Sequence, residues 1–126
     1  NFRMPNVNAA LLLAQLEKLE DYRASKSLVY AKYQSFFETN IKGADLMSIP
    51  DTTSQSNYWL MSVQFENREA RDEFLNNTNS QGIMTRPIWQ LMYKLPMYSD
   101  CQRDDQRNAE FLEDTIVNIP SSARFE

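Results

Sequence analysis

The chain of 126 residues contains no histidine, one cysteine and two glycines, and each shortage excludes a class of function. Without histidine, the chain offers neither an imidazole general base nor a histidine-bound metal site. Gly43 and Gly82 are too far apart to form a glycine-rich phosphate loop. Cys101 cannot form an internal disulfide, which is typical of a protein from a reducing compartment. These residues therefore do not predict a self-sufficient active site.

The chain also lacks long apolar runs and clustered basic residues. No stretch approaches the roughly 20 apolar residues that a membrane span requires, and no signal peptide is recognisable. Lys and Arg number 13 against 17 Asp and Glu, which gives a net charge of −4, and the basic residues are scattered. This distribution does not support a nucleic-acid footprint. We therefore expect a cytoplasmic protein that binds neither nucleic acid nor a membrane.

The first feature that is present is a helical pattern from Asn6 to Ile41, without internal Pro or Gly. Asn6 or Asn8 is expected to cap it. About 35 residues at a 1.5 Å rise make ~50 Å, whereas a compact domain of this size is nearer ~35 Å across. Either the helix kinks, or its first half packs against something outside this domain. The segment Ala9–Ala14 is apolar nearly all round, which favours the second option.

The rest of the chain alternates short strand and helix patterns. The predicted elements are a loop at 44–57, a strand at 58–65, a helix at 67–77, a strand at 83–86, a helix from 104 or 105 to 113, and a strand at 115–119. Alternation places Trp59, Met61 and Val63 on one face of the first strand, and Asn67 is expected to cap the helix after it. This order predicts an α+β fold, a two-layer sandwich with a small, mainly antiparallel sheet.

Three stretches carry a family resemblance: Asn1–Ala10, Gly82–Trp89 together with Lys94–Tyr98, and Val117–Ser122. In this order they resemble the C-terminal part of the pyridoxal-phosphate-dependent nucleotide-sugar aminotransferases of the DegT–DnrJ type. The likeness covers essentially all 126 residues. It implies a fold like the small C-terminal domain of fold-type I aminotransferases.

The resemblance also implies that residues 1–126 are a single C-terminal domain of a larger enzyme. Residues 1–42 then form a helix that contacts the large pyridoxal-phosphate-binding domain and the partner of a homodimer, and residues 58–126 form the small sandwich. The chain opens with Asn1, and Met4 is its first methionine, so we expect a fragment. The catalytic lysine is expected upstream, and the isolated fragment is expected neither to catalyse nor to bind the cofactor.

Cofactor-binding candidates lie at the start of the chain. In the family that the chain resembles, an asparagine before the long helix contacts the cofactor phosphate of the neighbouring subunit. Asn1 occupies that place and Arg3 lies beside it, and amide and guanidinium donors suit a dianionic phosphate. The alternative is that Asn1 and Arg3 are only a solvated start.

Substrate-binding candidates are Arg86, Trp89 and Tyr93. Arg86, at the end of a strand, could face a nucleotide diphosphate, while Trp89 or Tyr93 lines the sugar or base pocket. The alternative places Trp89 in the core and leaves Arg86 half-exposed. At Tyr93 the wider family often has a histidine, so a proton-handling role is in doubt there. We interpret Lys94 as a surface charge rather than the Schiff-base lysine, and Cys101 as an incidental thiol.

The function that the resemblance implies is amination of a keto-sugar carried on a nucleoside diphosphate. Within the family, the motifs look most like enzymes of bacterial surface-sugar synthesis, of the legionaminic-acid type. Dehydration or deoxygenation by the same cofactor stays open, because the residue that decides lies upstream. A different class also stays open: a stand-alone α+β module that binds a ligand or a protein without catalysis.

Overall fold

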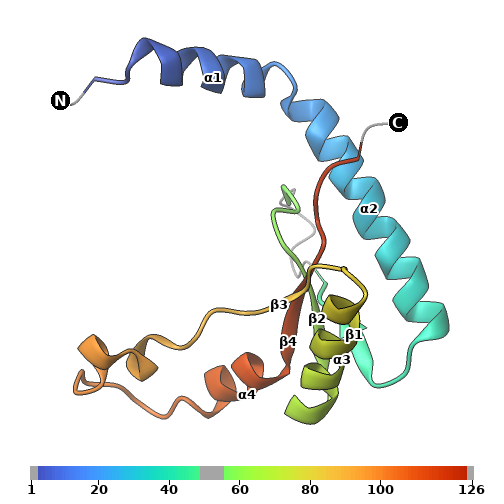
Figure 1. The fold of residues 1–126 in the computed structure, drawn as a ribbon, viewed down its shortest axis with the longest axis vertical. Helices are drawn as coiled ribbons and strands as arrows, with labels where there is room; N and C mark the ends of the chain where they lie inside the picture. The colour runs from blue at the N-terminus through green and yellow to red at the C-terminus, as the bar shows by residue number, and fades with distance from the viewer. Residues whose placement is uncertain (1–2, 49–55, 125–126) are drawn as a thin grey trace.

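The computed structural model describes residues 3–48 and 56–124 of the chain. Helices and strands are interspersed along it (Figure 1). The elements are α1 (Asn6–Leu16), α2 (Leu19–Asn40), β1 (Ala44–Leu46), β2 (Met61–Phe65), α3 (Arg68–Ser80), β3 (Arg86–Pro87), the 3₁₀ helices η1 (Met92–Lys94) and η2 (Pro96–Tyr98), α4 (Arg107–Thr115) and β4 (Ile116–Ile119). The predicted α+β fold class is confirmed.

The strands form one antiparallel sheet in the order β1-β2-β4-β3. Val63 on β2 lies opposite both Leu46 on β1 and Val117 on β4. Because opposed residues of neighbouring strands share a face, one face of the sheet is apolar. The core on this face consists of Ala44, Met61, Val63 and Ile119, packed against Val29, Tyr33 and Phe37 of α2 and Phe74 of α3. The second layer is therefore built by α2 and α3.

Two local predictions around the sheet have different outcomes. Asn67 caps α3 as expected, since its side chain accepts a hydrogen bond of 2.9 Å from the Ala70 N–H. The loop predicted from residue 44 is wrong at its start, because Ala44–Leu46 forms β1. Gly43, with φ +81°, turns the chain from α2 into this edge strand. A strand of three residues is too short to show a period of two in the sequence.

The long predicted helix is broken. α1 ends at Leu16 and α2 begins at Leu19, and the Lys18 N–H bonds to the Gln15 carbonyl at 3.2 Å, a tightened 3₁₀-type turn. The segment contains no Pro or Gly, so local sequence gave no signal for the break. The predicted cap is also wrong. Pro5 is the N-cap residue and Asn6 already lies in the first turn, without a capping side chain.

α1 extends away from the sheet, at the far end of the molecule from α4 (Figure 1). All of its residues are exposed. Its leucines include Leu11, Leu12 and Leu13, which are 62%, 47% and 59% exposed. α1 therefore presents an apolar surface to solvent in the described chain. In the described part of the chain, no helix is both long enough and apolar enough to cross a membrane.

The start of β2 differs from the predicted strand. The strand begins at Met61, and Tyr58 has φ +51°, which interrupts the alternation before it. Met61 and Val63 are buried as a pair, but Trp59 is 67% exposed. The Lys26 ammonium on α2 donates to the Tyr58 carbonyl at 2.9 Å and fixes this turn against the helix.

Candidate functional site

The segment between β3 and α4 is an aromatic-rich excursion, residues 88–106, and its anchor is Glu113. The Glu113 carboxylate accepts a hydrogen bond of 3.0 Å from the Leu91 N–H and an ion-paired hydrogen bond from Lys94. Burial pulls the pKa of Glu113 upward, but the hydrogen bonds from Lys94 and Leu91 outweigh it and hold the pKa below its ordinary value. α4 therefore carries a charged carboxylate that holds η1 in place.

Tyr93 has its hydroxyl engaged rather than free. The hydroxyl donates to the Glu110 carboxylate, one turn before Glu113 on α4, and this hydrogen bond raises the pKa of Tyr93. The ring of Tyr93 lies under the Arg103 guanidinium, with 4.7 Å from Arg103 Cζ to the ring centroid. Tyr93 thus contributes an anchor through its hydroxyl and a platform for Arg103 through its ring. The expectation that Tyr93 lines a substrate pocket stays a prediction.

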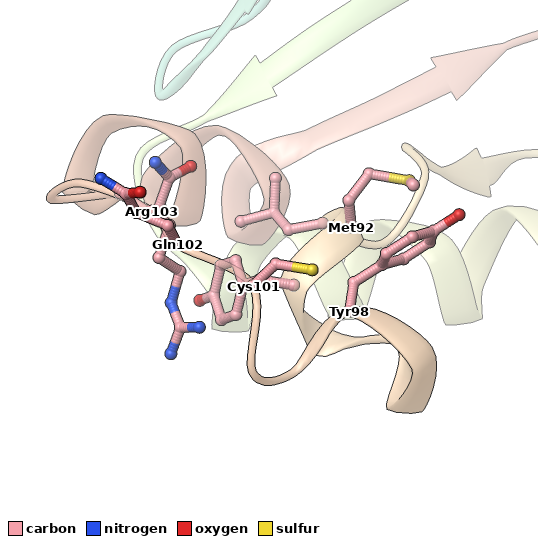
Figure 2. A pocket seen from close by; sticks show the side chains of 8 residues that line it. Met92, Tyr98, Cys101, Gln102 and Arg103 are labelled. Atoms are coloured by element: carbon pink, nitrogen blue, oxygen red, sulfur yellow. The ribbon is translucent and has the colours of Figure 1, made fainter.

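A cavity of about 340 Å³ lies in this excursion. It is lined by Leu91, Met92, Tyr93, Tyr98, Cys101, Gln102, Arg103 and Gln106. Figure 2 shows Met92 and Tyr98 on one side of it, Gln102 and Arg103 on the other, and Cys101 between them. The walls combine apolar and aromatic side chains with one guanidinium, a combination that ligand pockets use. Cys101, interpreted from sequence as incidental, is an exposed thiol at this cavity.

Arg86 lies elsewhere, on the face of the sheet opposite the core. It is directly opposite Asn118 on β4, and Asn118 is in turn opposite Ser62 on β2. The three side chains therefore form one row across the sheet. The Ser62 hydroxyl donates to the Asn118 side-chain oxygen at 2.7 Å, and Arg86 is exposed at the end of the row. This polar row leaves Arg86 available to an anion.

Trp89 is 69% exposed, so the alternative that it belongs to the core is wrong. Its ring lies 6.3 Å from the ring of Trp59 between centroids, at an interplanar angle of 42°. Trp59 is also exposed, which the alternating pattern did not indicate. Two tilted indole rings on the surface offer flat apolar area to a ring-shaped ligand or to another domain.

The three predicted substrate residues are therefore not gathered in one cavity. Tyr93 lines the cavity of the excursion, whereas Arg86 and Trp89 do not. Arg103 and Tyr98 also line this cavity and were not among the candidates from sequence. Both sit in a segment without periodicity, where no spacing distinguishes them from other loop residues.

The predicted cofactor residues are at the start of the chain. Asn1 lies outside the described residues. Arg3 is described, is exposed and precedes α1, the helix that extends away from the sheet (Figure 1). A free guanidinium in this position suits a phosphate held by another domain or subunit.

Two further features of the described chain concern metal binding and Lys94. Residues 3–48 and 56–124 contain no group of three or more Cys, Asp or Glu side chains arranged to hold a metal ion. The hydrogen bond to Glu113 raises the pKa of Lys94, whereas an imine-forming lysine needs a lowered pKa. Lys94 is therefore ion-paired with Glu113 rather than a free surface charge, and its interpretation as a group other than the Schiff-base lysine stays a prediction.

Comparison with known proteins matches the chain to one family of aminotransferases. The sequence profile of the DegT/DnrJ/EryC1/StrS aminotransferase family matches residues 1–126. The chain is 30% identical over 121 residues to the GDP-perosamine synthase of Escherichia coli O157:H7, covering 96% of this chain and 32% of that protein. It is 27% identical over 127 residues to the GDP-perosamine synthase of Caulobacter vibrioides, covering 98% and 33%. The chain thus spans about a third of the length of these relatives.

Solved structures share the fold. Helicobacter pylori PseC, described as an aminotransferase involved in the biosynthesis of pseudoaminic acid, superposes with a TM-score of 0.86 at 18% identity, covering 100% of this chain and 34% of that chain. The aminotransferase TlmJ from Streptoalloteichus hindustanus superposes with a TM-score of 0.85 at 16% identity, covering 95% and 32%. At such identities the likeness establishes the architecture alone.

Proposed function

Because the chain belongs to the DegT/DnrJ/EryC1/StrS aminotransferase family, we propose that it is the C-terminal domain of an enzyme that aminates a nucleotide-linked keto-sugar with pyridoxal phosphate. The observation that carries the proposal is the family match across all of residues 1–126. We propose residues 1–42 as the region that contacts the large domain and the second subunit, and residues 58–126 as the small sandwich. The function requires the remainder of the enzyme.

On the substrate side, Arg86, Trp89 and Tyr93 have separate roles in this proposal. Arg86, exposed at the end of the polar row on the sheet, attracts an anionic group such as a diphosphate. Trp89, exposed beside Trp59, covers an apolar ring face. Tyr93 shapes the excursion, because its hydroxyl is committed to Glu110. None of the three needs to move a proton.

The cofactor side of the proposal uses Arg3 and Asn1. Pyridoxal phosphate, when bound, supplies an electron sink for removal of a proton next to the transferred amino group. The exposed guanidinium of Arg3 fits its phosphate end, and Asn1 is the proposed second donor. The imine-forming lysine is proposed upstream. Within this chain, Lys94 is paired with Glu113, and Lys26, whose pKa burial lowers, donates to the Tyr58 carbonyl.

The exposed leucines of α1 support the proposed contact with the rest of the enzyme. Leu11, Leu12, Leu13 and Leu16 are each at least 47% exposed along a helix that extends from the sheet. Their burial against the large domain and the second subunit would remove this apolar surface from water. A homodimer follows in the proposal, since Arg3 and Asn1 then reach the cofactor of the neighbouring subunit.

The sugar remains to be assigned by experiment. The relatives named GDP-perosamine synthase make a GDP-linked keto-sugar the first substrate to test. The sequence motifs favour a nucleotide-linked precursor of the legionaminic-acid type as the second. We propose glutamate as the amino donor in both cases.

The decisive experiment uses the full-length protein that contains this domain. Its visible absorption spectrum is recorded before and after borohydride reduction, and the modified lysine is located by peptide mapping. We expect a yellow protein whose colour becomes fixed on a lysine upstream of residue 1. A colourless protein that pyridoxal phosphate cannot reconstitute would contradict the proposal and leave the non-catalytic binding module as the better explanation.

A further inference from the structure

We propose that Asn79, in the last turn of α3, is a positioning residue that sets where the Arg86 guanidinium meets an anionic group of the substrate. This rests on the proposed function, in which Arg86 attracts that group. Arg86 is exposed, whereas Thr85, the residue before it, is only 5% exposed. Successive residues of an extended chain face opposite sides of the sheet. The contacts that hold Thr85 inward therefore also decide where Arg86 emerges.

β3 has too little pairing to fix its own register. It comprises only Arg86 and Pro87, which lie opposite Asn118 and Val117 at the edge of the sheet. Pro87 has no backbone N–H, so it donates no hydrogen bond to the ladder. A slip of one residue would turn the Arg86 side chain to the other face of the sheet. Contacts outside the strand are therefore needed to set its register.

The first of these contacts is the way the chain leaves α3. Gly82, with φ +76°, donates its N–H to the Asn79 carbonyl at 3.0 Å, and the Ile83 N–H donates to the Thr78 carbonyl at 2.9 Å. These two hydrogen bonds are those of a Schellman motif, in which glycine commonly ends a helix. The short connection from α3 to β3 consequently starts in a fixed direction (Figure 1).

The second contact is a polar cluster of α3 that holds Thr85. The Asn79 side-chain nitrogen, Nδ2, donates to the Thr85 hydroxyl at 2.9 Å and to the Thr85 carbonyl at 3.2 Å. The hydroxyl oxygens of Thr85 and Thr78 are 2.6 Å apart, and the Thr78 hydroxyl donates to the Phe74 carbonyl at 2.7 Å. Because a hydroxyl has one proton, Thr85 donates to Thr78. The buried hydroxyl of Thr85 is thus both donor and acceptor.

Asn79 is the member of this cluster that reaches the backbone next to Arg86. The Thr85 carbonyl that it binds belongs to the same rigid peptide group as the Arg86 N–H. Nδ2 also donates to the Leu75 carbonyl at 2.8 Å, which fixes the Asn79 side chain against its own helix. Loss of the Asn79 amide therefore releases the peptide group before Arg86, whereas the apolar core does not include Asn79.

The anion contact of Arg86 can be followed without knowing the sugar. The full-length protein is treated with limiting phenylglyoxal, which modifies arginine side chains, and modification of Arg86 is quantified by peptide mass spectrometry. Inorganic pyrophosphate is the probe, because it carries the anionic group that sugars linked to a nucleoside diphosphate share. We expect pyrophosphate to slow the modification of Arg86, which gives a concentration for half-maximal protection.

Two alanine variants of α3 test the positioning role. Asn79→Ala should raise the concentration for half-maximal protection of Arg86 about fivefold, the effect of losing one neutral hydrogen bond. Asn77→Ala is the matched control, because Asn77 is exposed on the same helix and the same side chain is removed. We expect no change for it. An equal half-protection concentration in Asn79→Ala and the unmodified protein would overturn the positioning role.

A third variant separates positioning from stability. Asn67→Ala weakens α3 at its other end, through loss of the hydrogen bond from the Ala70 N–H, and leaves the cluster around Thr85 unchanged. It should unfold at a lower urea concentration than the unmodified protein and keep the same half-protection concentration for Arg86. If Asn67→Ala weakens protection as much as Asn79→Ala, α3 acts only through its stability and the inference is wrong.

The absorption spectrum separates this inference from the proposed enzyme. A yellow, borohydride-reducible protein in which pyrophosphate leaves Arg86 unprotected, or protects it equally in Asn79→Ala, refutes the positioning role and leaves the aminotransferase proposal standing. A colourless protein in which Asn79→Ala weakens protection of Arg86, and the two control variants do not, has the reverse meaning. It supports the positioning role and contradicts the cofactor enzyme.

Discussion

Replacing Glu113 with alanine should detach the excursion from α4 while leaving the sheet intact. Two hydrogen bonds end on this carboxylate, one from the Leu91 N–H at 3.0 Å and one from Lys94. The hydrogen bond from the Leu91 amide to a charged acceptor is worth about 1.5–3 kcal/mol. The ion pair adds less, because the Lys94 side chain is one-third exposed and solvent screens it. The amide contact therefore dominates.

The loss should appear as local opening rather than global unfolding, because the core of Ala44, Met61, Val63 and Ile119 does not include the excursion. We expect amides of residues 91–101 to exchange hydrogen about tenfold faster or more in Glu113→Ala. Amides of β2 and β4 should keep their rates. The measurement is hydrogen exchange followed by mass spectrometry on the full-length protein.

Two further variants make this prediction specific. Glu113→Gln keeps an acceptor for the Leu91 amide but loses the charge, so its exchange rates should lie between those of Glu113→Ala and the unmodified protein. Asp114→Asn is the control, because Asp114 is ion-paired with Arg68 and makes no hydrogen bond to residues 88–106 in the described chain. Unchanged protection of residues 91–101 in Glu113→Ala would refute the anchoring role that we assign to Glu113.

Other predictions concern the core, a helix cap, pH and α1. Val63→Ala should lower the free energy of unfolding by roughly 2–3 kcal/mol, measured by urea titration, because Val63 is fully buried. Asn67→Ala should cost about 1 kcal/mol through loss of the Ala70 N–H acceptor, while Asn77→Ala on the exposed surface of α3 should not destabilise. The pKa of Glu113 lies below its ordinary value of 4.5, so its anchoring is present above that value and should be lost as pH falls through the lower folded pKa; hydrogen exchange as a function of pH tests this. Leu12→Glu should leave the fold of the sheet unchanged but weaken subunit association in analytical ultracentrifugation, and an unaltered dimer would count against the proposed contact of α1.

Much of the sheet and of its second layer could be predicted from the sequence, because apolar residues recur there with the period of a strand or of a helix. On β2, the apolar Met61 and Val63 alternate with polar residues, which predicts a strand. Asn67 precedes a run with helical spacing, which predicts the start of α3. The length of the predicted helix allowed a kink as one of two alternatives, but its position at Glu17–Lys18 could not be predicted, since it involves neither Pro nor Gly. The edge strand at Ala44–Leu46 is defined by pairing with β2, a contact between distant segments that a local pattern does not contain.

The candidate site was less predictable for a related physical reason. Arg86 could be placed at a strand end, but its face depends on the register with Asn118, which only the folded sheet fixes. The placement of the Arg103 guanidinium depends on the Tyr93 ring, ten residues earlier, lying beneath it, and that stacking has no signature in a segment without periodicity.

The excursion can accept substitutions more readily than the sheet. The sheet residues are constrained by packing on one face, whereas the excursion is held by a few polar contacts to α4, chiefly through Glu113 and Glu110. Side chains that line the cavity, such as Tyr98 and Gln102, can therefore be exchanged without disturbing the core. The shape of this cavity can then vary while the fold and the anchor stay the same.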